Sequence, residues 1–401
     1  MVVRRSDADV RLSERAMSID IENLKKRFEA RYNRMPTGTV RAPGRVSLIG
    51  GATDYNDGFV LPIAIERETI AVFAVRDDRT VTLASLQREG LDASFDLDSE
   101  IVPEKPNWAN YCRGVAAGLR GKGVKLVGMD ILFESDVPLG GGLSSSASLE
   151  VAAGLAMLTA CGETMGDYEL ARLCQKAEHE FANSPCGIMD QAIAVMARAG
   201  RALLLDCRDG SVKQIKFDDP NIVVLVADTQ VKHSIAEGGY ALRRAQCYAA
   251  ARKLGIKMLR DADPALIAAA AREGKLKDKE LMRARHVVGE IDRTLKAAEA
   301  LETGDYAKFG ELMVGSHVSL RDDYETSCEE LDLIVDVSLR CDGAYGARMS
   351  GGGFGGCAII LADADKADAI SQTVASRFAA KFGHPCPIFG THAAGGASVV
   401  A

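Results

Sequence analysis

The chain has 401 residues, of which 47% are hydrophobic and 26% are charged, and its 49 Lys and Arg against 56 Asp and Glu give a net charge of −7. This composition is typical of a folded globular protein and excludes a disordered, collagen-like or fibrous chain. An acidic chain without a basic tract is not expected to bind nucleic acid. Apolar stretches such as 222–227 are too short to span a membrane, so we expect no membrane partner either.

Apolar residues recur at helical or alternating spacing along most of the chain, and these patterns predict its secondary structure. The first predicted helix, 21–32, has Ser18 or Asp20 available as an N-cap. Further helices are predicted at 108–119, from the first glycine run to about residue 161, at 168–182, over most of 240–301 and near 364–382. Strands are predicted at 41–51, 68–76, 129–134, 202–206, 222–228, 344–349 and 357–362.

The order of these elements predicts an α+β or two-layer α/β fold, because strands and helices mix without strict βαβ alternation. A chain of this length favours two domains. Residues 1–17 are polar and charged and are expected to form a loose tail. The turn at 209–211 suggests a boundary within 207–215, which gives an N-terminal domain at 18–212 and a C-terminal domain at 213–401.

Cysteine and histidine spacing gives no indication of a zinc site or a disulfide framework. The ten cysteines include no CxxC pair, and the six histidines show neither HxH nor HxxxH spacing. No apolar segment follows Arg4 and Arg5, so a secretory signal is not expected. We therefore expect free thiols in a reducing cytoplasm.

A glycine- and serine-rich segment, Pro138–Ala147 (PLGGGLSSSA), lies between a predicted strand and a predicted helix. Glycines let a ligand approach the backbone closely, and the N–H groups at a helix N-terminus favour phosphate. The segment lacks the GK[ST] ending of a Walker A loop and the GxGxxG pattern of a dinucleotide-binding turn. A flexible linker is the alternative, but the strand–loop–helix context favours a phosphate-binding loop.

Three further segments carry residues that are suited to phosphoryl transfer. The run 349–356 (MSGGGFGG) predicts a tight loop that packs on another loop or on a ligand, or else a structural turn. The segment 41–55 places Arg45 and Asp54 beside a strand-to-turn junction, where they can neutralise a phosphoryl group and accept hydrogen bonds from sugar hydroxyls, or form a surface ion pair. The fourth segment, 186–191 (CGIMDQ), places Asp190 three residues after Gly187.

Together these segments resemble the galactokinase branch of the GHMP small-molecule kinases. PLGGGLSSSAS resembles the phosphate loop of the family, GRVSLIGGATDYNDGFVLP its sugar signature, and RMSGGGFGGC its third motif. AEHEFANSPCGIMDQ, NWANY and the segment 317–325 are also similar to galactokinases. The resemblance runs from about Arg41 to the C-terminus. It implies a two-domain GHMP kinase fold, with a ribosomal protein S5 domain 2-like N-terminal domain, a ferredoxin-like C-terminal domain and the active site in the cleft between them.

The resemblance also implies the role of each site residue. Asp190 corresponds to the catalytic aspartate near the C1 hydroxyl of the sugar, and Arg45 to the arginine that stabilises transition-state charge. The implied metal ligands, for Mg²⁺, are Ser146 and Glu178. The implied sugar-binding residues are Asp54, Gly187, Asp190, Tyr240 and Gly51. The implied ATP-binding residues are Gly140, Gly141, Gly142, Leu143, Ser144, Ser145, Ser146 and Ala147, with Trp108 beside adenine unless it is only a half-buried core residue.

The sugar signature departs from the family at two positions. Galactokinases carry GEHTDY where this chain has Gly50–Tyr55 (GGATDY), so a carboxylate and an imidazole are replaced by Gly51 and Ala52. In the family these two side chains reach the C6 hydroxyl of galactose, whereas the aspartate (here Asp54) holds the C3 and C4 hydroxyls. A hydrogen bond from a charged group contributes about 1.5–3 kcal/mol, so losing that carboxylate is expected to weaken galactose binding by about 10–100-fold.

Two substrates therefore stay open at this point. Galactose is one, with C6 held by water or by another side chain, and L-arabinose, which lacks C6, is the other. A catalytically silent sugar sensor on the same fold is the rival from another functional class. The complete segment Ser144–Ala147 and the presence of Asp190 favour an ATP-dependent sugar 1-kinase. We expect this kinase to work as a monomer or weak dimer.

Overall fold

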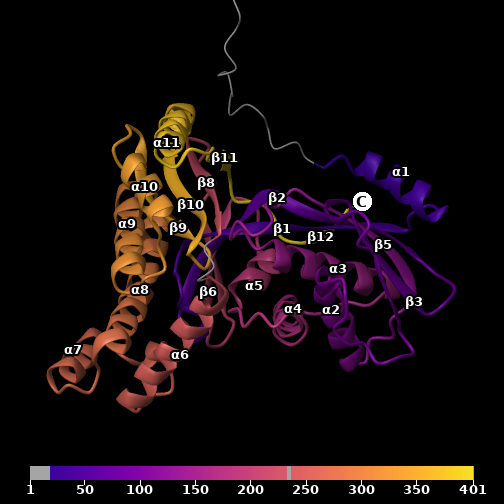
Figure 1. The fold of residues 1–401 in the computed structure, drawn as a ribbon, viewed down its shortest axis with the longest axis horizontal. Helices are drawn as coiled ribbons and strands as arrows, with labels where there is room; N and C mark the ends of the chain where they lie inside the picture. Colours follow the sequence, from indigo (N-terminus) through magenta and orange to yellow (C-terminus); the bar gives the residue numbers. More distant parts are fainter. Residues whose placement is uncertain (1–18, 233–235, 401) are drawn as a thin grey trace, which may run out of the picture.

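The computed structural model describes residues 19–232 and 236–400, which form two sheets with helices packed on them (Figure 1). The larger sheet has the order β12-β1-β2-β5-β3-β4, with β6 paired to β2 and β7 paired to β6. Its strands are β1 (Gly38–Ile49), β2 (Phe59–Val75), β3 (Thr80–Ser85), β4 (Ala93–Asp96), β5 (Met129–Ser135), β6 (Arg201–Asp206), β7 (Val212–Lys216) and β12 (Ser398–Val399). The smaller sheet has the order β11-β8-β10-β9 and contains β8 (Ile222–Lys232), β9 (Ala344–Ser350), β10 (Gly355–Asp363) and β11 (Ile388–Thr391).

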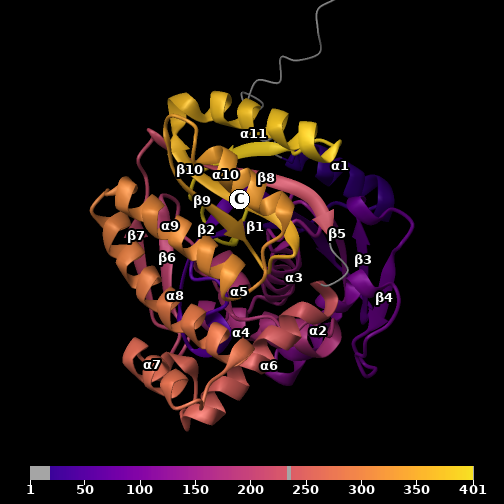
Figure 2. The same cartoon turned by 60° about the vertical axis from the view of Figure 1, so that its left-hand side comes forward.

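The helices divide between the two sheets in chain order (Figures 1 and 2). The first sheet is covered by α1 (Ile21–Tyr32), α2 (Asn110–Gly121), α3 (Ser145–Cys161), α4 (Asp167–Phe181) and α5 (Met189–Met196). The second group is α6 (Ala236–Leu254), α7 (Pro264–Arg272), α8 (Asp278–Glu302), α9 (Tyr306–Asp322), α10 (Glu329–Ser338) and α11 (Ala367–Phe382). No described helix is both long enough and apolar enough to cross a membrane.

Helix α1 begins and ends where its sequence predicts. The Asp20 carboxylate accepts a hydrogen bond of 3.0 Å from the backbone N–H of Asn23, which satisfies one of the free N–H groups of the first turn. Asn33 ends the helix in the left-handed conformation. Asp20 is therefore the cap, whereas Ser18, the other candidate, and the expected tail at 1–17 lie outside the described residues.

Alternation along β2 explains why helices cover both faces of the first sheet. Ile70 and Val72 point to one side, where they pack in the same core cluster as Leu24 of α1. Ala71 and Phe73 point to the other side, into the core shared with α2, α3 and α4. A strand with both faces buried is a nearly continuous apolar run, and residues 70–75 of β2 follow this pattern.

The second sheet is also buried on both faces, and one of these faces joins the two halves of the molecule. Leu225 and Ile360 pack on the helices of the second half. Val226 and Ile359, one residue before or after them, pack in one cluster with Val46 and other residues of β1 and β2. This alternation gives the two sheets a continuous apolar core, which fixes how they face each other across the active site.

The strand pairing bears on the expected domain boundary. Strand β7 pairs with β6 over the register from Arg201↔Lys216 to Leu205↔Val212, so this hairpin belongs to the first sheet. A division between residues 212 and 213 would cut β7, and we therefore propose a boundary within residues 217–221. Near its C-terminal end the chain returns to the first sheet, where Val399 of β12 pairs with Val40 of β1.

Candidate active site

Three side chains from three separate segments meet at the centre of the site. Arg45 lies on β1, Ser144 immediately precedes α3, and Asp190 is the second residue of α5. Arg45 binds the Asp190 carboxylate with two parallel hydrogen bonds, Nε to Oδ1 at 2.9 Å and Nη2 to Oδ2 at 2.8 Å. The Ser144 hydroxyl donates to Oδ2 of the same carboxylate. This bidentate geometry fixes the carboxylate in direct contact with the serine-rich loop.

The glycine- and serine-rich segment forms the expected loop between β5 and α3. Gly140 and Gly142 have φ values of 73°, and Ser144 is also left-handed at 62°. Ser144 is not a glycine, so this conformation costs about 1–3 kcal/mol and is maintained by the surrounding contacts. The backbone N–H groups of the first turn of α3 begin at Ser145, where they can meet phosphate oxygens.

A cavity of 200 Å³ lies beside this loop and contains the only tryptophan of the chain. It is lined by Gly140, Ser145 and Ser146 of the loop and by Trp108. The Trp108 indole packs edge-to-face on Phe133, with ring centroids 6.3 Å apart, and donates from Nε1 to the Leu91 carbonyl at 2.7 Å. Trp108 is thus a half-buried packing residue that also forms part of the cavity wall.

Besides Ser144, which points to Asp190, two residues of the predicted nucleotide-binding set have side chains that are buried away from this cavity. Leu143 is 1% exposed and packs in the core between the two sheets, and Ala147 is fully buried. These two residues contribute to the loop through their backbone atoms. The Leu143 carbonyl accepts a hydrogen bond of 3.0 Å from the Arg45 backbone N–H.

The second glycine run packs against the phosphate loop. A Cβ added to Gly351 would lie 2.8 Å from the Gly142 carbonyl oxygen, and one added to Gly356 would lie 3.1 Å from that of Gly141. Both of these contacts are to backbone, so no side chain fits at either position without moving a loop. This confirms a loop that packs on another loop, and it brings Gly351 and Gly352 to the wall of the neighbouring cavity.

That neighbouring cavity, of 380 Å³, contains the residues predicted to bind sugar. Asp54, Asp190 and Tyr240 line it, together with Gly51 and Gly187. Its other lining residues come from β1, the α4–α5 connection, α6, α9 and the α9–α10 connection. They include residues to which the sequence motifs gave no individual role: Ser47, Asn183, Arg243, Leu320, Tyr324 and Thr326. We refer to it below as the sugar cavity, after the ligand that its residues are expected to bind.

Glycine is required at residue 187 because of Asp54. A Cβ at this position would overlap the Asp54 carboxylate. The carboxylate accepts a hydrogen bond of 3.0 Å from the Tyr55 backbone N–H. Tyr55 in turn packs edge-to-face on Tyr240, with centroids 5.2 Å apart, and shares a 2.6 Å hydrogen bond with the Tyr324 hydroxyl. The wall of the cavity is therefore a tightly packed set of side chains around one carboxylate.

Burial raises the pKa of Asp54 to about 6, and the nearby Asp190 carboxylate adds to the effect. Asp54 is thus far easier to protonate than an exposed aspartate, because two carboxylates in one poorly hydrated cavity repel each other. A perturbed carboxylate of this kind in a cavity is typical of a functional site.

The two residues expected to bind a metal ion lie together behind the phosphate loop. Burial raises the pKa of the Glu178 carboxylate, as does Asp190, whereas a hydrogen bond from Ser146 lowers it. Gln191 donates to Glu178 Oε2 at 2.7 Å. Among the described residues no three His, Cys, Asp or Glu side chains converge as a metal cage. One carboxylate and one hydroxyl beside a phosphate loop nevertheless fit Mg²⁺, which keeps water and phosphate oxygens as its other ligands.

Known families match three parts of the chain. The model for the N-terminal domain of GHMP kinases matches residues 110–198, that for their C-terminal domain matches residues 297–380, and the galactokinase galactose-binding signature matches residues 26–75.

Curated relatives and solved structures agree with these matches. Galactokinases of Homo sapiens and Chloroflexus aggregans are 45% and 44% identical to the chain, over 86% and 95% of its length and 89% and 98% of theirs. The crystal structure of Lactococcus lactis galactokinase complexed with galactose has a TM-score of 0.90 and 31% identity, and covers 94% of this chain and 99% of that one. Mevalonate kinase of Methanococcus jannaschii, at 20% identity and a TM-score of 0.63, shares the fold.

Proposed function

The chain belongs to the galactokinase family of the GHMP kinases, and from that premise we propose that it transfers the terminal phosphoryl group of ATP to the anomeric hydroxyl of galactose. The observation that carries the proposal is the contact between Asp190, which lines the sugar cavity, and Ser144 of the phosphate loop. A phosphoryl group and a sugar hydroxyl can meet only where their two binding sites share such a border.

The chemistry assigned to this border needs one base and one cation from the protein. Asp190 accepts the proton of the anomeric hydroxyl, the freed oxygen forms the bond to the terminal phosphorus, and the bond from that phosphorus to the bridging oxygen breaks to release ADP. Arg45 holds the carboxylate by its two hydrogen bonds and stabilises the negative charge that develops on the transferring group. The contact of Asp190 with a complete phosphate loop favours this enzyme over a silent sensor.

The remaining assignments follow the same division of the site. Asp54 and Tyr240 are proposed to bind the sugar ring, with Gly187 making room for Asp54. Residues 140–147 are proposed to bind the phosphates of ATP and Trp108 to pack beside its base. Ser146 and Glu178 would hold Mg²⁺, which when bound with ATP neutralises phosphate charge.

We further propose that the protein works in the cytoplasm as a monomer or weak dimer. All ten cysteines carry free thiols, as a reducing compartment favours.

The test is the product formed from a panel of free sugars. Purified protein is incubated with ATP and Mg²⁺ and with galactose, L-arabinose, galacturonate or N-acetylgalactosamine, and sugar 1-phosphate is detected by phosphorus NMR. We expect galactose 1-phosphate with the highest kcat/KM. A higher kcat/KM for L-arabinose would reassign the substrate, and binding of sugar and ATP without any product would show a sensor.

A further inference from the structure

The turn at Gly50–Ala52 forms part of the wall of the sugar cavity, yet it carries no acidic or aromatic side chain of its own. Gly51 and Ala52 both line the cavity. Gly51 is outside the left-handed region, so the cost of a side chain there comes from neighbouring side chains that must shift and not from backbone torsion. A Cβ at this position would lie 2.8 Å from Arg348 Nη2 and 3.2 Å from Leu320 Cδ1.

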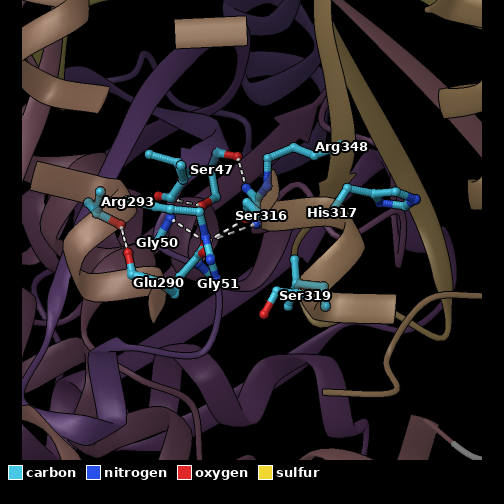
Figure 3. A network of polar contacts seen from close by, with 12 residues as sticks. Ser47, Gly50, Gly51, Glu290, Arg293, Ser316, His317, Ser319 and Arg348 are labelled. Carbon is cyan, nitrogen blue, oxygen red and sulfur yellow. Dashed lines mark hydrogen bonds and ion pairs between the residues drawn. The ribbon is translucent and has the colours of Figure 1, made fainter. Parts of the chain in front are cut away.

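A carboxylate from helix α8 binds the backbone of this turn (Figure 3). Glu290 Oε1 accepts hydrogen bonds from the backbone N–H groups of Gly50 at 3.1 Å and Gly51 at 3.0 Å. The Glu290 side chain is fully buried, so these bonds have no competition from bulk water. A carboxylate that receives two successive N–H groups fixes the direction of both peptide planes.

Cations keep this carboxylate charged despite its burial. Arg293 Nε donates to Glu290 Oε2 at 2.8 Å, and Arg348 Nη2 lies 4.0 Å from Oε1. Burial alone would raise the pKa of Glu290, but Arg293, Arg348 and the hydrogen bond from Ser316 help to bring it down to about 2. Arg348 also binds the end of strand β1, which leads into the turn, because its Nη1 donates to the Ser47 carbonyl at 2.6 Å.

An imidazole from the same helix binds the next peptide of the turn. His286 precedes Glu290 by four residues and so lies on the same face of α8. Its Nε2 lies 3.0 Å from the Gly51 carbonyl oxygen, which can only accept, so Nε2 carries the proton and Nδ1 accepts from the Ser319 hydroxyl at 2.9 Å. Burial lowers the pKa of His286 to about 4, so the ring is neutral at physiological pH. The peptide it holds leads into Ala52, which is left-handed at φ 63°.

We propose that Glu290 and His286 are positioning residues for the sugar. Helix α8 binds three successive peptide groups of the turn with one carboxylate and one imidazole, and these two side chains hold the wall of the cavity in the shape that binds the substrate. The proposal rests on the proposed function, since the wall matters only if a sugar occupies this cavity.

The Arg348 guanidinium gives the proposal a consequence that a general structural role would not have. It lies within reach both of Glu290 and of any side chain placed at residue 51. A carboxylate introduced at residue 51 would therefore share this arginine with Glu290, and two buried carboxylates beside one arginine repel each other. Positions 51 and 290 are expected to be strongly coupled.

Four variants test this coupling. Glu290→Ala is expected to raise the galactose KM by about tenfold or more, with kcat and the ATP KM within about threefold of wild type, because only hydrogen bonds to a sugar-binding turn are lost. Glu290→Gln keeps an acceptor oxygen, so its galactose KM is expected to lie between the values for wild type and Glu290→Ala. Gly51→Glu is expected to have a more favourable effect on galactose binding in the Glu290→Ala background than in the wild-type background, because the repulsion between the two buried carboxylates is then absent. Asp292→Ala, which removes an exposed acid of the same helix, is the matched control.

The readout is the dissociation constant of galactose from calorimetry, together with initial rates and melting temperature. If Glu290→Ala does not fold, Glu290→Gln and the double variant carry the test. An unchanged galactose affinity in the folded Glu290 variants, or the same effect of Gly51→Glu in both backgrounds, overturns the proposal. Wild-type protein that binds galactose but forms no sugar phosphate would instead refute the proposed function and leave the coupling measurable.

Discussion

A single methyl group at residue 187 provides the sharpest test of the sugar site. In Gly187→Ala the new Cβ would overlap Asp54 Oδ2 and crowd both its Cγ and its other oxygen, so the carboxylate must leave its place. The backbone at residue 187 is outside the left-handed region, so alanine is not strained by torsion and the effect is one of space.

The size of the effect follows from what the carboxylate does. Each hydrogen bond from a sugar hydroxyl to a charged acceptor contributes about 1.5–3 kcal/mol, so two such bonds contribute about 3–6 kcal/mol, or about 10²–10⁴-fold in sugar affinity. If the displaced carboxylate keeps one bond, the loss is at the lower end of this range. The ATP KM should change little, because Gly187 does not line the cavity beside the phosphate loop.

Initial rates with varied galactose at saturating ATP measure the loss, and circular dichroism checks the fold. The control is Gly121→Ala, a glycine at the end of α2 whose added Cβ meets nothing within 4 Å. This control is expected to be neutral or slightly stabilising, because it reduces the freedom of the unfolded chain. A galactose KM within about threefold of wild type in Gly187→Ala would refute the assignment of Asp54 to the sugar.

Four further predictions concern the remaining parts of the site. Asp190→Asn is expected to lower kcat by about 10²–10⁴-fold while galactose and ATP still bind by calorimetry, and activity above about a tenth of wild type would exclude Asp190 as the base. Because the pKa of Asp54 is about 6, kcat/KM for galactose should fall as the pH falls through 6, and Asp54→Asn should remove this pH dependence. The free energy of unfolding should instead decrease as the pH rises from 3.8 to about 6, since the carboxyl of Asp54 holds its proton more tightly in the folded than in the unfolded protein. Ser146→Arg should abolish turnover with Mg²⁺ and ATP while galactose binding by calorimetry is preserved. The fluorescence of Trp108, the only tryptophan, should change on addition of ATP, and a Trp108→Phe variant should show no such change. An unchanged wild-type spectrum would place the adenine ring of ATP away from Trp108.

The sequence predicted most helices and the segments of the site because these depend on local patterns. Helix α1, its cap and the loop between β5 and α3 each follow from a few adjacent residues, and the structure confirms them as structural elements. Strand β2 was predicted only from residue 68, although it begins at Phe59, because Pro62 interrupts its apolar run. The short strands β3, β4, β7, β11 and β12 and helix α5 gave no signal of sufficient length, and helices α9 and α10 were not predicted either.

The supporting residues of the site could not be predicted, because their partners are far away in the chain. Glu290 and Gly50 are separated by 240 residues, and Ser47 and Arg348 by 301. In sequence Glu290 is one of many acids on a charged helix, and only the tertiary structure places it against a turn. The spacing of His286 and Glu290 by four residues was the one local signal, and it also fits an ordinary helix surface.

The apolar cluster between the two sheets has a consequence for dissecting the molecule. If the chain were cut within residues 217–221 and the halves were separated, this cluster would be exposed to water. Its members include Val46, Leu61 and Ile63 on one side and Val226 and Ile359 on the other. Each half produced alone should therefore aggregate, whereas the two halves refolded as a mixture should reassemble and regain kinase activity, much as a split reporter does.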